Sequence, residues 1–163
     1  MPAGTFPPDV IAAACASQAR WDIPASVCLA QWALESAWGR AMPPRSNNPF
    51  GIKARAGEPA VVAMTREVID GRNLRLPQRF RRFSSLTVAF DAHGRLLATA
   101  GAYAAARAVR CNGRAFARGL QGHYATDPDY AAKLVALIDA HDLGRFDAAG
   151  PAPDLPNPKE HLC

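Results

Sequence analysis

The stretch between Val27 and Trp38 constrains the fold more than any other part of the chain, because nearly every residue in it is apolar. Only Gln31, Glu35 and Ser36 are polar in this stretch. A helix of this composition can expose little surface to water, so we expect it to lie at the centre of a helical domain. Glu35 would then be a poorly solvated carboxyl.

Burial of Glu35 has a chemical consequence. On a helical wheel its neighbours are Gln31, Trp32 and Trp38, so the two indoles should exclude water from the carboxyl and raise its pKa. A carboxyl that keeps its proton near neutral pH is suited to general acid catalysis. The alternative is a glutamate at a helix end that reaches solvent or pairs with an arginine.

The flanking segments predict an α+β domain that is mainly helical. The loop "MPPRSNNPFG" follows the central helix, and residues 59–83 are rich in β-branched residues around Asp70-Gly71, a pair typical of hairpin turns. We expect Asp127 to cap the last helix, with Pro128 in its first turn. The sequence therefore predicts a small β-hairpin inserted after the second helix. The predicted helices cover residues 8–20, 24–38, 86–98, 101–109, 113–121 and 128–143.

Length and charge limit the classes of protein to consider. The 163 residues fit one domain, which we place at 1–146, followed by a proline-rich tail at 147–163. The net charge of +5 and the arginines of "RLPQRFRRF" favour a polyanion, which could be nucleic acid, anionic lipid or an acidic polymer such as bacterial cell wall, although a basic soluble protein fits equally well. The sequence has no platform of alternating basic and aromatic residues, so it does not predict nucleic-acid binding. No apolar run approaches the ~20 residues that cross a bilayer, so we expect no membrane insertion.

The four cysteines have no spacing that would hold a metal, and we expect neither a metal nor an organic cofactor. Cys15 and Cys28 fall on successive antiparallel helices, where they form either a disulfide or two buried free thiols. With Cys111 and Cys163, three pairings are open. The N-terminus lacks the basic region of a signal peptide, so we expect export by a dedicated secretion system or release by lysis.

A series of motifs resembles glycoside hydrolase family 73, which includes the flagellar peptidoglycan hydrolase domain and many bacterial autolysins. The motifs "AQWALESAWGR", "SNNPFGIKA", "MTREVIDG", "RFRRFSS", "AFDAHGRLL" and "YATDPDYAAKLVALI" occur in the family's order across residues 10–146. The resemblance implies a lysozyme-like fold with a small β-lobe. It also implies hydrolysis of the β-1,4 bond between N-acetylglucosamine and N-acetylmuramic acid in peptidoglycan.

The resemblance assigns catalytic roles to three residues. Glu35 takes the position of the general acid. Glu67 falls in the β-lobe, where it would act as a base, orient water or stabilise positive charge on the sugar, unless it is a solvated strand residue paired with a nearby arginine. Glu58, Asp70 and the substrate's own N-acetyl group are alternatives to Glu67, and retention or inversion stays open. Tyr124 would face the acid and either bind the substrate or place the nucleophile, and the alternative is a tyrosine that only packs in the core.

The resemblance also implies a set of substrate contacts, with an alternative for several of them. Phe83 would stack on a sugar ring, while Arg81 would attract substrate carboxylates or lie on a solvated strand. For His93 we favour a structural, hydrogen-bonded role, and for Tyr130 a packing role at the head of the last helix. The candidate contacts are Trp38, Asn48, Gly51, Lys53, Arg81, Phe83, His93 and Tyr130.

The sequence thus predicts a monomeric peptidoglycan N-acetylglucosaminidase that acts on glycan strands in the periplasm or cell wall. A muramidase or lytic transglycosylase of the same fold, a prophage endolysin and a non-catalytic wall-binding module are the alternatives. An antibacterial effector injected into a rival's periplasm is the biological setting we favour. It predicts a periplasmic immunity protein that plugs the substrate site.

Overall fold

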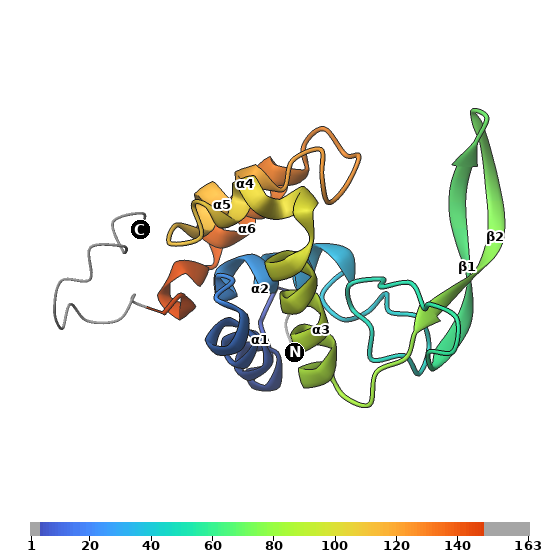
Figure 1. The fold of residues 1–163 in the computed structure, drawn as a ribbon, viewed down its shortest axis with the longest axis horizontal. Coiled ribbons are helices and arrows are strands. Elements are labelled where there is room, and N and C mark those ends of the chain that lie inside the picture. The colour runs from blue at the N-terminus through green and yellow to red at the C-terminus, as the bar shows by residue number, and fades with distance from the viewer. Residues whose placement is uncertain (1–3, 149–163) are drawn as a thin grey trace, which may run out of the picture.

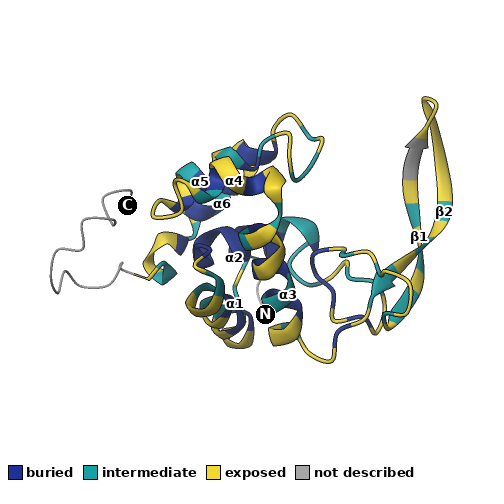
Figure 2. Cartoon of the chain, in the orientation of Figure 1, coloured by how far each residue is buried: buried dark blue, intermediate teal, exposed yellow. Residues whose placement is uncertain are grey.

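A buried helix, α2 (Ala25–Glu35), forms the centre of the structure, a computed structural model that describes residues 4–148 without the side chains of Glu67 and Val68. All of its residues up to Ala33 are buried (Figure 2). Further helices contact it on several sides, and a hairpin of two strands projects away from them (Figure 1). The elements are α1 (Pro8–Trp21), β1 (Ala60–Ile69), β2 (Arg72–Arg81), α3 (Leu86–Thr99), η1 (Gly101–Tyr103), α4 (Ala104–Arg107), α5 (Gly113–Gly119), α6 (Tyr130–Ala140) and η2 (Leu143–Phe146).

The central helix ends at Glu35, so the prediction that it reaches Trp38 is wrong. Ala37 and Trp38 have left-handed φ angles of 46° and 61°, and the chain leaves the helical path there. The hydroxyl of Ser36 stabilises this turn by accepting a hydrogen bond from the backbone N–H of Gly39 at 2.8 Å. Glu35 therefore lies at the C-terminal end of the helix, beside a tight turn.

The hairpin of β1 and β2 agrees with the sequence prediction. The strands are antiparallel, with Ile69 opposite Arg72. Asp70 and Gly71 both have positive φ, 51° and 73°, as a two-residue turn of type I′ requires. The predicted α+β class, mainly helical with a hairpin inserted after the second helix, is confirmed.

The buried side chain of Asn48 joins the loop after α2 to the hairpin. Its Nδ2 donates to the carbonyls of Ile52 and Arg81, at 2.8 and 2.9 Å, and its Oδ1 accepts from the N–H of Ile52. The N–H of Phe83 also donates to the carbonyl of Ser46. These bonds fix the base of the hairpin to the loop that precedes it.

Helices α1 and α3 approach each other closely at Gly94. A Cβ atom at this position would lie 2.1 Å from Oγ of Ser17 and 2.9 Å from Cδ1 of Trp21. The same Ser17 hydroxyl donates to the buried carbonyl of Phe90 at 2.9 Å. Only a residue without a side chain allows this packing, since interiors leave no room for an added methyl group.

The last long helix begins at Tyr130 rather than at Pro128, so the predicted cap at Asp127 is wrong. The side chain of Asp127 accepts from the N–H of Asp129, and its carbonyl accepts from the N–H of Tyr130. Asp127 therefore closes a turn that precedes the helix, a role in which aspartate is common. Asp129 occupies the N-cap position.

Cys15 and Cys28 are free thiols, which excludes the disulfide between them. Near them, both carboxylate oxygens of Asp147 accept hydrogen bonds from Ser26 at the start of α2, each at 2.8 Å. The predicted tail therefore begins with a residue that contacts the helical body, while its residues 149–163, with Cys163, lie outside the described residues. No helix between residues 4 and 148 is long and apolar enough to cross a membrane.

Candidate active site

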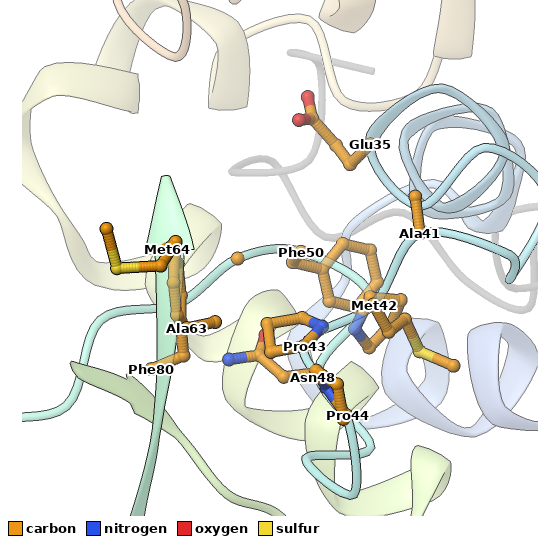
Figure 3. Close-up of a pocket in the computed structure, with 12 residues that line it drawn as sticks. Glu35, Ala41, Met42, Pro43, Pro44, Asn48, Phe50, Ala63, Met64 and Phe80 are labelled. Atoms are coloured by element: carbon orange, nitrogen blue, oxygen red, sulfur yellow. The ribbon is translucent and has the colours of Figure 1, made fainter. Parts of the chain in front are cut away.

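Glu35 lines a pocket of about 390 Å³ between the helical body and the hairpin (Figure 3). The loop segments 41–44 and 48–51 form one side of this pocket, and Ala63, Met64 and Phe80 form the side toward the strands. All of these lining residues are uncharged. Among the described residues that line the pocket, Glu35 is thus the only one that can ionise, and we call this pocket the acid pocket.

The environment of Glu35 favours its protonated form. Burial raises the pKa of this half-buried carboxyl, and a hydrogen bond that Tyr130 donates opposes part of the rise. The bond joins Oη of Tyr130 to Oε1 of Glu35 at 2.8 Å. The direction of the pKa shift matches the expectation from the sequence.

The two indoles that we expected around Glu35 lie elsewhere. The ring of Trp38 is 6.2 Å from that of Trp32 and packs on Phe6 and His141, with centroids 4.8 and 5.0 Å apart. Neither indole lines the acid pocket. Because α2 ends at Glu35, the turn carries Trp38 into an aromatic cluster with Phe6, Trp32 and His141.

Two tyrosines lie beside the acid. The rings of Tyr124 and Tyr130 stack with centroids 5.5 Å apart, at an interplanar angle of 12°. Tyr124 also meets His93 edge-on at 5.7 Å. Burial raises the pKa of both phenols, with a further contribution from the nearby Glu35, so both hydroxyls stay neutral at physiological pH. The structure therefore places Tyr124 near the acid, and Tyr130 in direct contact with it.

A buried amide connects this cluster to His93. Gln31 donates from Nε2 to Oη of Tyr130 at 2.9 Å, and its Oε1 lies 2.8 Å from Nε2 of His93. Gln31 and His93 are both fully buried, and burial lowers the pKa of His93 to about 3. The sequence marked Gln31 as one of few polar residues on the central helix, one turn before Glu35, but gave it no role.

Three predicted contacts lie on or near the loop and hairpin base. Asn48 and Gly51 line the acid pocket, although the amide of Asn48 already bonds the backbone of the loop and of β2. Gly51 has a φ of 62°, a conformation that favours glycine. Phe83 is only 3% exposed and does not line the acid pocket, so its ring offers no open face to a sugar there.

Lys53 and Arg81 line a second pocket, of about 420 Å³, between the hairpin base and α3. Arg81 pairs with Glu58 at 3.6 Å, and its guanidinium lies 5.0 Å from the ring centroid of Phe83. These two cations are therefore not brought together with Glu35. Their predicted role toward substrate carboxylates stays a prediction.

The candidates for a second carboxylate differ in position. Glu67 lies on β1 opposite Leu74 of β2, and its side chain lies outside the described part of the chain. It lies four residues beyond Ala63 toward the hairpin tip, about 13 Å along the strand at ~3.3 Å per residue. Glu58 accepts a hydrogen bond from the N–H of Arg55, Asp70 occupies the hairpin turn, and neither lines the acid pocket.

The described residues contain no group of three or more histidine, cysteine, aspartate or glutamate side chains placed to hold a metal ion. Acid chemistry at Glu35 is the reaction type that the residues of the acid pocket support directly.

Comparisons with known proteins identify the family. The family described as mannosyl-glycoprotein endo-beta-N-acetylglucosaminidase matches residues 11–143. The chain is 32% identical to the exo-glucosaminidase LytG of Bacillus subtilis (strain 168), over 78% of this chain and 47% of LytG. It is 36% identical to a probable N-acetylmuramidase of Lactococcus lactis subsp. lactis (strain IL1403), over 78% of this chain and 31% of that protein. The chain thus spans about half or less of the length of these curated relatives.

A solved structure supports the same assignment. A C-terminally truncated glycoside hydrolase domain of FlgJ from Salmonella typhimurium matches with a TM-score of 0.68 at 33% identity, covering 82% of this chain and 96% of that one. The fold, the family match and the acid pocket together define a glycoside hydrolase. The chain belongs to the glucosaminidase family, glycoside hydrolase family 73, which its motifs predicted.

Proposed function

We propose that this protein is a peptidoglycan hydrolase that cleaves the β-1,4 bond between N-acetylglucosamine and N-acetylmuramic acid. The observation that carries the proposal is the half-buried Glu35, whose pKa burial raises and which is the only ionisable group among the described residues that line the pocket beside the hairpin. The name of the relative FlgJ, a peptidoglycan hydrolase that is 34% identical over 123 residues, supports the choice of polymer.

Glu35 acts as the general acid. It transfers its proton to the glycosidic oxygen while the bond from that oxygen to the anomeric carbon breaks, so the leaving sugar departs as a neutral alcohol. The anomeric carbon becomes positively charged, and water adds to it and releases a proton. The hydrogen bond from Tyr130 stabilises the carboxylate that remains after the transfer, because a donated bond favours the charged form.

A second group must either stabilise the positive charge at the anomeric carbon or accept the proton from the water that adds to it. We keep Glu67 in this role, with the substrate's N-acetyl group as the alternative. Glu58 is a weaker candidate because it already bonds Arg55 and pairs with Arg81. Tyr124, stacked on Tyr130 near the acid, would bind the substrate or place the nucleophile.

The identity of the cleaved bond is the finer part of the proposal. LytG is named an exo-glucosaminidase and the Lactococcus lactis relative a probable N-acetylmuramidase, so relatives of similar identity carry different names. Both bonds are β-1,4 glycosidic bonds between N-acetylated sugars. The same acid would serve either, and a lytic transglycosylase would use it as well.

Digestion of purified peptidoglycan tests the proposal. Glu35→Gln should fold as the wild type does and release no soluble fragments, whereas Asp142→Asn, an equivalent change on an exposed carboxylate, should retain activity. Mass spectrometry of borohydride-reduced fragments should find N-acetylglucosaminitol at the reduced ends. Reduced muramic acid or an anhydro sugar would instead assign a muramidase or a transglycosylase. Full activity of Glu35→Gln would refute the role of the acid.

The substrate places the site of action at the cell wall or in the periplasm. The secretion route, the monomeric state and the role as an injected effector with a periplasmic immunity protein stay predictions. Coexpression in the periplasm tests the last of these, because a true immunity protein would abolish lysis by binding over the acid pocket.

A further inference from the structure

Four side chains from three helices form one continuous hydrogen-bonded chain that ends at the acid. His93 on α3 bonds Gln31 on α2, Gln31 bonds Tyr130 on α6, and Tyr130 bonds Glu35 at the end of α2. The three contacts measure 2.8, 2.9 and 2.8 Å. His93, Gln31 and Tyr130 are buried, so water does not compete for these bonds.

The chemistry of the groups fixes the direction of the chain. The Oε1 of Gln31 can only accept, so Nε2 of His93 must carry the single proton of this neutral imidazole. The Nε2 of Gln31 then donates to Tyr130, whose own proton is directed to Oε1 of Glu35. Nδ1 of His93 has no hydrogen-bond partner among the described residues, so the chain begins at this imidazole. Every donor therefore points toward Glu35.

This direction decides which oxygen of the acid carries the proton. Because Oε1 accepts from Tyr130, the proton of the neutral carboxyl must sit on Oε2. No hydrogen bond from the described residues occupies Oε2, and the carboxyl oxygens point away from the α2 ribbon (Figure 3). If Tyr130 lacked its donor from Gln31, its hydroxyl could turn and accept the acidic proton of Glu35 instead. The proton would then point into the protein rather than toward a substrate.

We propose that Gln31 and His93 are positioning residues, which hold the hydroxyl of Tyr130 as a donor to Oε1 of Glu35 and so keep the acidic proton on Oε2. Neither residue lines the acid pocket, so both act through Tyr130 and not on the substrate. The inference rests on the proposed role of Glu35 as the acid. It adds a reason for the polar residues inside an otherwise apolar core.

The titratable surroundings of Glu35 allow a clean test. On the side of α6, the titratable groups are Tyr130 and Tyr124, with Tyr103 of η1 behind them. On the side of the loop and the hairpin, the described residues of the acid pocket are uncharged. Both tyrosines nearest the acid titrate above the pH range in which Glu35, with its raised pKa, loses its proton, and His93 titrates below it.

The experiment is a titration of the protein labelled with ¹³C-glutamate, in which the carboxyl signal of Glu35 is assigned by its absence in Glu35→Gln. Removing a donor from a carboxylate raises its pKa. Tyr130→Phe should raise the titration midpoint of Glu35 by about one pH unit or more, and Gln31→Met by about half of that. Gln31→Met should add nothing in the Tyr130→Phe background, because its effect passes through that hydroxyl.

Activity on peptidoglycan gives the second readout. In Gln31→Met the alkaline limb of the pH profile for kcat should move to higher pH, by as much as the titration midpoint of Glu35 does. KM should stay unchanged. If Gln31→Met fails to fold, His93 supplies a matched pair of variants. His93→Gln can still donate to Gln31 and should titrate as the wild type does, whereas His93→Leu cannot and should shift the midpoint as Gln31→Met would.

Three results would overturn the inference. The first is a titration midpoint of Glu35 that is unchanged in both Gln31→Met and His93→Leu. The second is a shift of that midpoint by Gln31→Met that is equal with and without the hydroxyl of Tyr130. The third is a kcat of Gln31→Met that is lower at every pH while the alkaline limb of its pH profile stays in place. The titration does not depend on catalysis, so it separates this inference from the proposed function. An active Glu35→Gln variant would refute the acid role, while the titration would still report on the hydrogen-bonded chain.

Discussion

The contact at Gly94 makes a quantitative prediction about stability. Gly94→Ala would place a methyl group 2.1 Å from Oγ of Ser17 and 2.9 Å from the ring of Trp21. The serine must then turn away and leave the buried carbonyl of Phe90 without its donor, which costs about 1–3 kcal/mol. Overpacking adds about 1–3 kcal/mol, and the better helix propensity of alanine returns about 1 kcal/mol. Together these contributions should lower the free energy of unfolding by about 1–5 kcal/mol.

Urea unfolding followed by circular dichroism measures this change. Gly101→Ala is the matched control, because nothing lies within 4 Å of a Cβ there, and it should differ from the wild type by less than about 0.5 kcal/mol. Ser17→Ala removes the atom at 2.1 Å, so the double variant Ser17→Ala/Gly94→Ala should lose at least about 1 kcal/mol less than the sum of the single variants. Two results would contradict the close contact between α1 and α3 at Gly94. One is a Gly94→Ala protein as stable as the wild type, and the other is a double variant whose loss of stability equals the sum of the two single losses.

Two other predictions follow from buried ionisable groups. Since burial raises the pKa of Glu35, the folded state holds this proton more tightly than the unfolded state does, and the stability of the wild type falls as pH rises above the ordinary carboxyl pKa. Glu35→Gln should therefore be more stable than the wild type in thermal unfolding at pH 7 but not at pH 3, and a difference independent of pH would contradict this. Burial raises the pKa of Cys28 to about 12, so peptide mass spectrometry after native alkylation at pH 8 should find Cys28 unmodified and the partly exposed Cys15 slowly modified. Equal labelling of both thiols would argue against the burial of Cys28.

The general architecture was predictable because its determinants are local. The apolar stretch that contains Glu35 can only be a central helix, and Asp70-Gly71 between β-branched segments specifies a two-residue hairpin turn. The ends of helices were less predictable. Trp38 continues the apolar pattern, yet three successive residues with positive φ carry it out of the helix. The sequence around Asp127 is typical of a helix N-cap, but its side chain accepts a hydrogen bond from the N–H of Asp129 in the turn before α6.

The site was predictable only in part. The raised pKa of Glu35 followed from composition, because an apolar helix must bury its carboxyl somewhere. The hydrogen-bond partner of that carboxyl could not be predicted from composition. Tyr130 lies far along the chain and reaches Glu35 only through the packing of α6 on α2. Gln31 carried the one available signal, a polar residue on the buried face one turn before the acid.

The position of Glu35 as the last residue of α2 has an electrostatic consequence of its own. Aligned peptide dipoles leave a partial negative charge of roughly half an electron at the C-terminus of a helix, where unpaired carbonyls gather. A carboxylate at this pole is repelled, so the helix itself favours the neutral acid. The turn that stops the helix thus sets the electrostatic field at the acid as well as its position. A glutamate one turn earlier would feel that field less and could not reach the acid pocket.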